Sequence, residues 1–70
     1  MYAKVNTFDE RARNAWSRIR DVCHWENTDE DFMAFQDEMQ RLLDEDEDDF
    51  EETCRMSGFN SSDVRYLLSY

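Results

Sequence analysis

The residues of this sequence that could do chemistry are mainly carboxylates, and they are crowded into one short stretch. Residues 44–52 read DEDEDDFEE, in which eight of the nine side chains are acidic. Such a run raises three possibilities: a divalent metal site, a catalytic site, or a negatively charged surface that binds a basic macromolecule. The identity and spacing of the neighbouring residues distinguish between them.

A calcium site is the first possibility, because Asp44, Asp46 and Asp48 occupy alternate positions, as in an EF-hand loop. In that register Asp49 stands where the turn requires glycine, and Arg55 stands where a bidentate glutamate is required. The motif therefore fails, and we expect no metal and no cofactor.

Catalysis has little support, because the single histidine, His24, directly follows Cys23. Consecutive residues on a helix do not face each other, so this pair is poorly arranged for one site. Cys23 and Cys54 have no spacing typical of zinc ligands, and we expect both to be small buried thiols. The sequence therefore predicts that the protein is not an enzyme.

The charge is strongly polarised along the chain. Residues 26–52 contain fourteen acids and only one base, Arg41, whereas the whole chain has a formal net charge of -10. Like charges three and four residues apart destabilise a helix by a few tenths of a kcal/mol per pair, so local stability does not explain the acidic run. A solvated acidic face is the simplest alternative, and a binding surface is the hypothesis that we favour.

The physical basis of this hypothesis is charge spacing. Duplex DNA carries about one negative charge per 1.7 Å of axis, and a helix rises about 1.5 Å per residue. We therefore expect the partner to be a basic nucleic-acid-binding protein or complex, and we expect no direct contact with nucleic acid or a membrane. The predicted partner-binding residues are Asp29, Glu30, Asp31, Asp37, Glu38, Asp44, Glu45, Asp46, Glu47, Asp48, Asp49, Glu51 and Glu52. Phe50 could add an apolar contact.

In size, acidity and short predicted helices, and in the charge of residues 26–52, the chain resembles the small phage-encoded DNA-mimic inhibitors of restriction and CRISPR systems. The resemblance rests on no sequence motif. It implies an inhibitor whose carboxylates occupy the nucleic-acid channel of a host nuclease or surveillance complex, or the site that reads a target duplex. The chain has no signal-peptide pattern and no apolar run of about 18 residues, so we expect a cytoplasmic protein, in the host cytoplasm if it is phage-encoded.

The elements that carry these residues are predicted to be helices, because the chain has no proline and only one glycine, Gly58. Thr7 and Glu10 form a capping box before a first helix over residues 8–24. Its apolar stripe recurs every three or four residues and includes Phe8, Ala12, Ala15, Trp16, Ile19, Val22 and Cys23. A second helix begins after Asn27 or Thr28 and runs to about residue 44.

A third helix is predicted over residues 47–57, with Gly58 as its C-terminal cap and Phe59 folding back over its last turn. Phe50 and Cys54 are expected on its buried face, with Met56 as a further candidate. A fourth helix is predicted to have Ser61 or Ser62 as its N-terminal cap. Residues 1–6 are too short to assign, although Tyr2 and Val5 could pack on the bundle. We therefore expect one all-α domain over residues 1–70, a three- or four-helix bundle that is monomeric or dimeric. Its predicted core is Trp16, Ile19, Phe32, Phe35, Met39, Leu42 and Leu67.

Two other functions fit parts of the pattern. In a homodimeric assembly protein, Arg11, Arg13, Arg18 and Arg20 of the first helix would pair with acids across an interface. Residues 50–68 also resemble a helix-turn-helix. However, Ser57 stands where an apolar residue is usual, and Arg65 is the only base of the presumed recognition helix. We interpret that segment as an ordinary helix corner.

Overall fold

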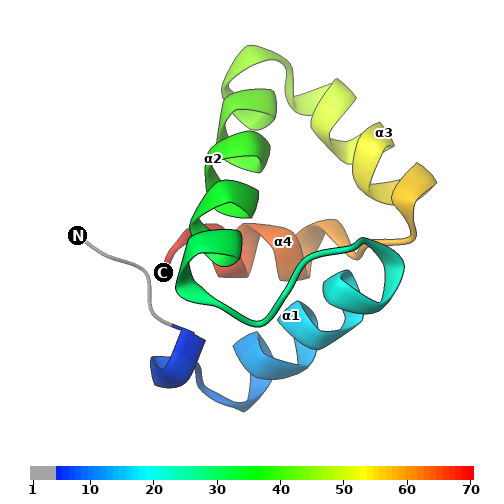
Figure 1. Cartoon of the computed structure of the whole chain (residues 1–70). Coiled ribbons are helices and arrows are strands. Elements are labelled where there is room, and N and C mark those ends of the chain that lie inside the picture. The colour runs from blue at the N-terminus through cyan, green and yellow to red at the C-terminus, as the bar shows by residue number, and fades with distance from the viewer. Residues whose placement is uncertain (1–4) are drawn as a thin grey trace.

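The computed structural model describes residues 5–70, which form four α-helices and no strand (Figure 1). A short 3-10 turn, η1 (Val5–Thr7), precedes α1 (Glu10–Val22) and α2 (Asp29–Glu45). Then follow α3 (Glu47–Ser57) and α4 (Ser61–Leu68). The small all-α bundle predicted from the sequence is thus confirmed, with four helices.

The other three helices pack around α4, which contacts each of them. In Figure 1, α2 and α3 meet at a corner at the top of the view, α4 crosses the middle, and α1 lies below it. The corner and α1 are therefore on opposite sides of α4. This arrangement separates the acids of α3 and of the end of α2 from the four arginines of α1.

The start of α1 differs from the prediction. Thr7 belongs to the 3-10 turn, and the helix is capped by Asp9, whose carboxylate accepts a hydrogen bond from the Ala12 N–H at 2.8 Å. Phe8, predicted to be the first helical residue, lies outside the helix and points into the core. Two tyrosines of the C-terminal segment also hydrogen-bond to Asp9, and these long-range contacts favour it as the cap.

The other helix starts follow the rule that a short polar side chain caps the first turn. Thr28 caps α2 as predicted, accepting a hydrogen bond from the Asp31 N–H at 3.2 Å. Asn60, and not Ser61 or Ser62, caps α4, because its side-chain oxygen accepts from the Ser62 N–H at 2.9 Å. The predicted cap was therefore one or two residues too late in the sequence.

Gly58 ends α3 as predicted. Its φ of 83° is in the left-handed region, which a residue with a Cβ rarely adopts. This turn lets the Phe59 N–H donate to the Cys54 carbonyl at 2.8 Å, and Phe59 folds back to pack against the core. The Phe59 and Phe35 rings lie 6.4 Å apart, centre to centre.

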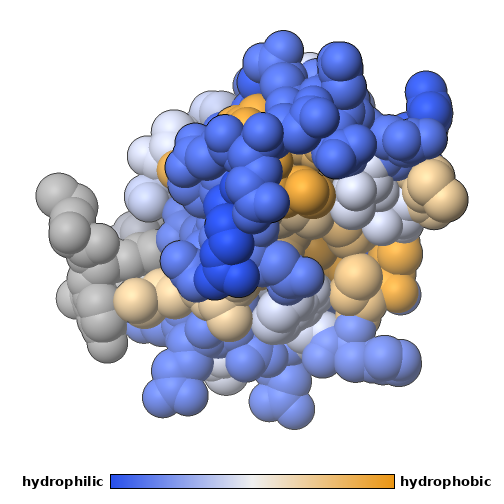
Figure 2. Space-filling view, turned by 90° about the horizontal axis from the view of Figure 1, so that it is seen from above, coloured by the Kyte–Doolittle hydropathy of each residue, from blue (hydrophilic) through white to orange (hydrophobic). Residues whose placement is uncertain are grey.

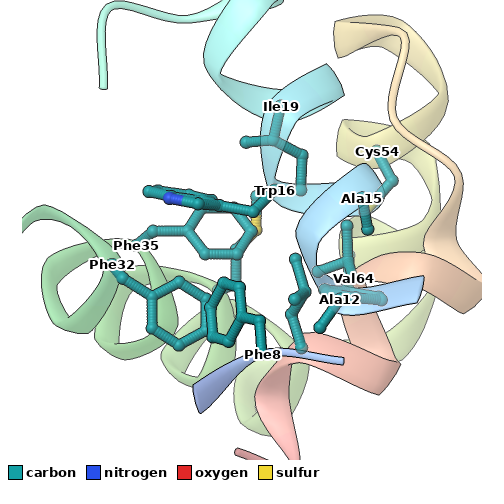
Figure 3. Packing of buried hydrophobic residues seen from close by; sticks show 12 residues of the cluster. Phe8, Ala12, Ala15, Trp16, Ile19, Phe32, Phe35, Cys54 and Val64 are labelled. Carbon is teal, nitrogen blue, oxygen red and sulfur yellow. The ribbon is translucent and has the colours of Figure 1, made fainter. Parts of the chain in front are cut away.

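The core contains a cluster of aromatic rings between α1 and α2 (Figure 3). It is extended by Phe50 and Cys54 of α3 and by Val64 and Leu67 of α4. The Trp16 ring lies 5.1 Å from Phe32 and 5.3 Å from Phe35. The buried residues are Phe8, Ala12, Ala15, Trp16, Ile19, Phe32, Phe35, Met39, Phe50, Cys54, Val64 and Leu67. Every predicted core residue is among them except Leu42, which is only partly buried.

Three apolar residues are more exposed than helical periodicity predicts. Val22 is 53% exposed at the end of α1, and Cys23, the next residue, is half-buried. Met56 is 79% exposed, although it was expected to help bury α3. Val5 packs against the core, whereas Tyr2 lies outside the described residues.

Candidate acidic interaction surface

The thirteen predicted partner-binding acids do not form one surface, because α2 separates them. Asp29, Glu30 and Asp31 lie in its first turn, and Asp44 and Glu45 lie in its last turn. Fifteen residues of helix between Asp29 and Asp44 correspond to about 22 Å. Only the second group is near α3, as the course of α2 in Figure 1 shows.

Two acids at the start of α2 hold neighbouring backbone in place. The Asp29 carboxylate accepts a hydrogen bond from the Val5 N–H at 2.8 Å, and Asp31 accepts from the Glu26 N–H at 2.7 Å. Both side chains also lie in the first turn of α2, where the helix dipole favours negative charge. Their positions are therefore explained by the fold, whereas Glu30 between them is exposed.

The middle of α2 carries acids on its outer surface. Asp37 forms an ion pair with Arg41, one turn later, at 3.1 Å. Asp44 accepts a hydrogen bond from the Gln40 side chain at 3.0 Å. Such exposed contacts contribute little to stability. Glu38 is exposed nearby.

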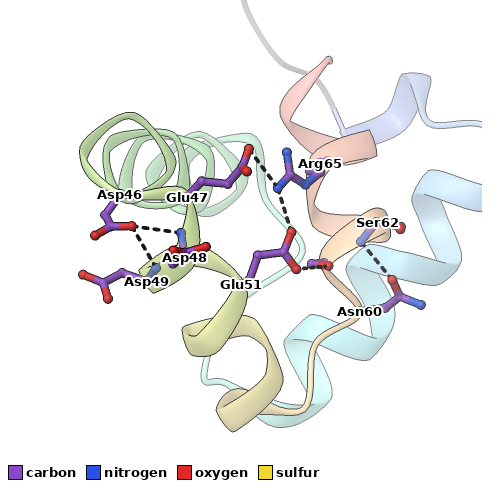
Figure 4. A network of polar contacts seen from close by, with 9 residues as sticks. Asp46, Glu47, Asp48, Asp49, Glu51, Asn60, Ser62 and Arg65 are labelled. Carbon is purple, nitrogen blue, oxygen red and sulfur yellow. Dashed lines mark hydrogen bonds and ion pairs between the residues drawn. The ribbon is translucent and has the colours of Figure 1, made fainter.

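Asp46 is the single residue between α2 and α3, and it belongs to the ends of both. Its N–H donates to the Leu42 carbonyl at 3.0 Å, which closes α2. Its carboxylate accepts from the N–H groups of Asp48 and Asp49, at 2.9 and 3.4 Å, and so caps α3 (Figure 4). One acid of the run is therefore a structural cap.

Glu47 and Glu51 turn toward α4, where both meet Arg65 (Figure 4). Arg65 lies 2.7 Å from the Glu51 carboxylate and 3.6 Å from that of Glu47. Glu51 also accepts a hydrogen bond from the Ser61 hydroxyl at 3.1 Å. The hydrogen bonds from Arg65 and Ser61 lower the pKa of Glu51, and the bond to Glu51 raises the pKa of Arg65. These two acids join α3 to α4.

The remaining acids of the run face outward. We call the exposed carboxylates of Asp44, Glu45, Asp48, Asp49 and Glu52 the acidic corner; among them Asp44 bonds to Gln40, and Glu52 lies 3.9 Å from Arg55. Figure 2 looks down on the corner where α2 meets α3, and hydrophilic side chains cover most of this view.

The negative charge of this region is not neutralised within the molecule. Three arginines, Arg41, Arg55 and Arg65, form ion pairs with acids of residues 26–52, where fourteen acids lie. An excess of eleven negative charges therefore remains. Eight of the fourteen acids lie within residues 44–52, so the acidic corner attracts cations and basic surfaces and repels other acids.

The arginines of α1 lie on the other side of α4. Arg11 and Arg18 approach the Asp63 carboxylate of α4 at 3.6 and 3.9 Å, and the Arg11 guanidinium lies 4.3 Å from the centre of the Tyr66 ring. An open hollow of about 490 Å³ lies between these arginines. Two of the four arginines considered as partners across a dimer interface are therefore already paired within the chain.

The other reactive side chains do not form a site. Among residues 5–70, no three His, Cys, Asp or Glu residues are placed to hold a metal ion. His24 is exposed in the segment after α1. Cys54 is buried in the core, which raises the pKa of its thiol. None of the described helices combines the length and the apolar character needed to cross a membrane.

Arg65 is the residue whose role was missed from the sequence. It was considered only as the single base of a presumed DNA-reading helix, but its guanidinium is engaged with Glu47, Glu51 and the face of the Phe50 ring, 5.2 Å away. The glutamates are 18 and 14 residues before it, so no local pattern reveals the contact.

Comparison of the chain with protein-family models, with curated proteins and with solved structures found no match.

Proposed function

We propose that the acidic corner binds the basic nucleic-acid-binding surface of another protein in place of nucleic acid, and thereby inhibits that protein. The observation that carries this proposal is the set of exposed carboxylates where α2 meets α3, on the side of the molecule away from the arginines of α1. The resemblance to phage-encoded DNA mimics suggests a host defence nuclease or a CRISPR surveillance complex as the target.

Charge spacing supports this proposal. Asp48, Asp49 and Glu52 lie on the outward surface of α3, within about one turn of each other. A groove that binds phosphates with lysine and arginine can bind such carboxylates by the same charge-assisted hydrogen bonds. Release of the ions that screen both surfaces makes such binding strongly dependent on salt.

The hydrogen bonds of the fold reduce the set of acids that we propose as contacts. Asp29, Asp31 and Asp46 hold backbone N–H groups, and Glu47 and Glu51 hold Arg65. Substitution of any of these would disturb the structure as well as the charge. The five residues of the acidic corner are therefore the ones to test.

The test compares two variants that lose the same charge. The corner variant combines Glu45→Gln, Asp48→Asn and Asp49→Asn. The control variant neutralises three exposed acids away from the corner, by Asp21→Asn, Glu26→Gln and Glu30→Gln. The side chains of all six residues lack an ion pair within the described chain, so both variants should fold.

Each purified protein is immobilised and exposed to a bacterial lysate at low salt, and bound proteins are eluted with duplex DNA and then with high salt. We expect wild type and the control variant to retain the same nucleic-acid-binding protein, released by the DNA. We expect the corner variant to lose it. Equal retention by the corner variant, or no partner that duplex DNA releases, would contradict the proposal.

A further inference from the structure

Met56 is the most exposed large apolar side chain of the described residues, at 79%, and it lies on the last turn of α3. It follows Glu52 by four residues and Asp49 by seven. At 3.6 residues per turn these three side chains share the outward surface of α3. The row of carboxylates thus ends in a flexible apolar group.

Phe50 is the apolar residue within the acidic run, and in the sequence it is a candidate both for the core and for an apolar contact with a partner. It is completely buried, beneath the carboxylates and against Arg65, so it cannot touch a partner. Met56 is the exposed apolar residue of α3, and in Figure 2 apolar side chains reach the surface on the right, the side where α3 ends in Figure 1.

Acids and apolar groups contribute differently to binding. Complementary charges mainly raise the association rate and select the partner. Groups that lose all their water on binding carry most of the affinity, and they slow dissociation. Methionine suits the second role, because its unbranched thioether adapts to irregular apolar pockets.

We infer that Met56 is the apolar anchor of the acidic corner, and that its partner is a protein with an apolar pocket beside a basic groove. This inference rests on the proposed function and names a feature of the partner. Charge complementarity selects this occupant, because Met56 lies in line with Asp49 and Glu52 on one face. A nucleic acid, being itself an anion, cannot occupy that face.

Two arginine-rich peptides of equal length and charge serve as probes, one with serine and one with leucine at every third position. Binding is followed by NMR of the methionine methyl groups, with the Met56 signal assigned through Met56→Gln. We expect wild type to bind the leucine peptide about fivefold more tightly or better, with a shift of the Met56 signal. Met56→Gln should abolish this preference.

Met33 provides the matched control, because it is 39% exposed on α2 and lies outside the acidic corner. Met33→Gln should keep the preference for the leucine peptide. Equal binding of both peptides by wild type, or an unchanged preference in Met56→Gln, would overturn the role of Met56. The corner variant separates the two proposals: loss of both peptides supports the acidic corner, whereas undiminished binding of both refutes the proposed function itself.

Discussion

Asp9 shows how one carboxylate can join distant parts of this chain. It caps α1 through the Ala12 N–H, and its second oxygen accepts a hydrogen bond from the Tyr66 hydroxyl of α4. Its own N–H donates to the Tyr70 hydroxyl at 3.2 Å. The Tyr66 hydrogen bond is the main cause of the lowered pKa of Asp9, and the same bond raises the pKa of Tyr66 to about 12.

The two pKa shifts predict that the Asp9–Tyr66 hydrogen bond stabilises the fold between an acid limit set by Asp9 and an alkaline limit set by Tyr66. A carboxyl group with a lowered pKa contributes stability above its unfolded pKa, and the contribution is lost as the pH falls through the folded pKa. For Asp9 this loss begins below its ordinary value of 3.8. A tyrosine with a raised pKa contributes below its unfolded value of about 10, and its contribution is lost as the pH rises through about 12.

Asp9→Asn tests the acid limit, because asparagine can still cap the helix but cannot titrate. At neutral pH we expect the variant to unfold at a lower urea concentration than wild type. This difference should shrink as the pH falls below about 4, because Asp9 is then protonated in unfolded wild type and, at still lower pH, in the folded protein. A difference between the two proteins that stays constant from neutral pH to pH 3 would show that the charge of Asp9 does not contribute.

At the residue level the sequence predicts where acids are concentrated but not what each acid does. Thirteen carboxylates look alike in sequence, whereas in the structure some hold backbone N–H groups and others hold arginines. Asp29 binds the N–H of Val5, 24 residues away, and Glu51 binds Arg65, 14 residues away. Only the packing of the helices decides which carboxylates remain exposed.

The helices themselves are well predicted, because their signals are local. The third helix, residues 47–57, has the predicted bounds, and α2 differs at its C-terminal end by one residue. The acidic run is helix on both sides of Asp46, although its like charges oppose a helix. Its repelling charges are tolerated because Phe50 and Cys54 anchor α3 in the core. Where the prediction failed, as with Asp9 and Asn60, several polar residues competed for the cap.

Gly58 gives a test of one such local signal. A residue with a Cβ pays about 1 kcal/mol to adopt the left-handed conformation at the end of α3. No heavy atom outside residues 57–59 lies within 4 Å of the position that a Cβ would take, so the cost is that of the backbone alone. We expect Gly58→Ala to lower the free energy of unfolding by about 1 kcal/mol in urea titrations.

Gly58→Asn provides the comparison, since asparagine adopts this conformation more readily than alanine. The asparagine variant should therefore lose less stability, despite its larger side chain. If both variants were as stable as wild type, the turn at Gly58 would not need a left-handed residue.

At the level of the whole molecule, the excess of acids over bases opposes folding. The net charge is -10, and eight of the eighteen acids are held together within residues 44–52, from the end of α2 through Asp46 to α3. Raising the ionic strength from about 0.01 M to about 1 M shortens the Debye length from about 30 Å to about 3 Å. Screening therefore weakens the repulsion within this region.

We expect the melting temperature, followed by far-UV circular dichroism, to rise with NaCl concentration. The corner variant should start from a higher melting temperature at low salt and gain less from added NaCl. The control variant should respond to salt as wild type does. A fall in the wild-type melting temperature with salt would mean that attraction within the ion pairs outweighs the repulsion.

Asp46 is the only residue between α2 and α3, and this one-residue connection (the joint) leaves little room for an inserted or deleted residue. Each residue added to a helix rotates the next part of the chain by about 100°, so one inserted residue at this joint would swing Phe50 out of the core and the outward acids toward it. The six residues 23–28 between α1 and α2 have more room to absorb a change. Insertions and deletions should therefore be tolerated far better in residues 23–28 than at the joint. At the joint, one change in the number of residues alters both the packing of the core and the direction in which the acids point.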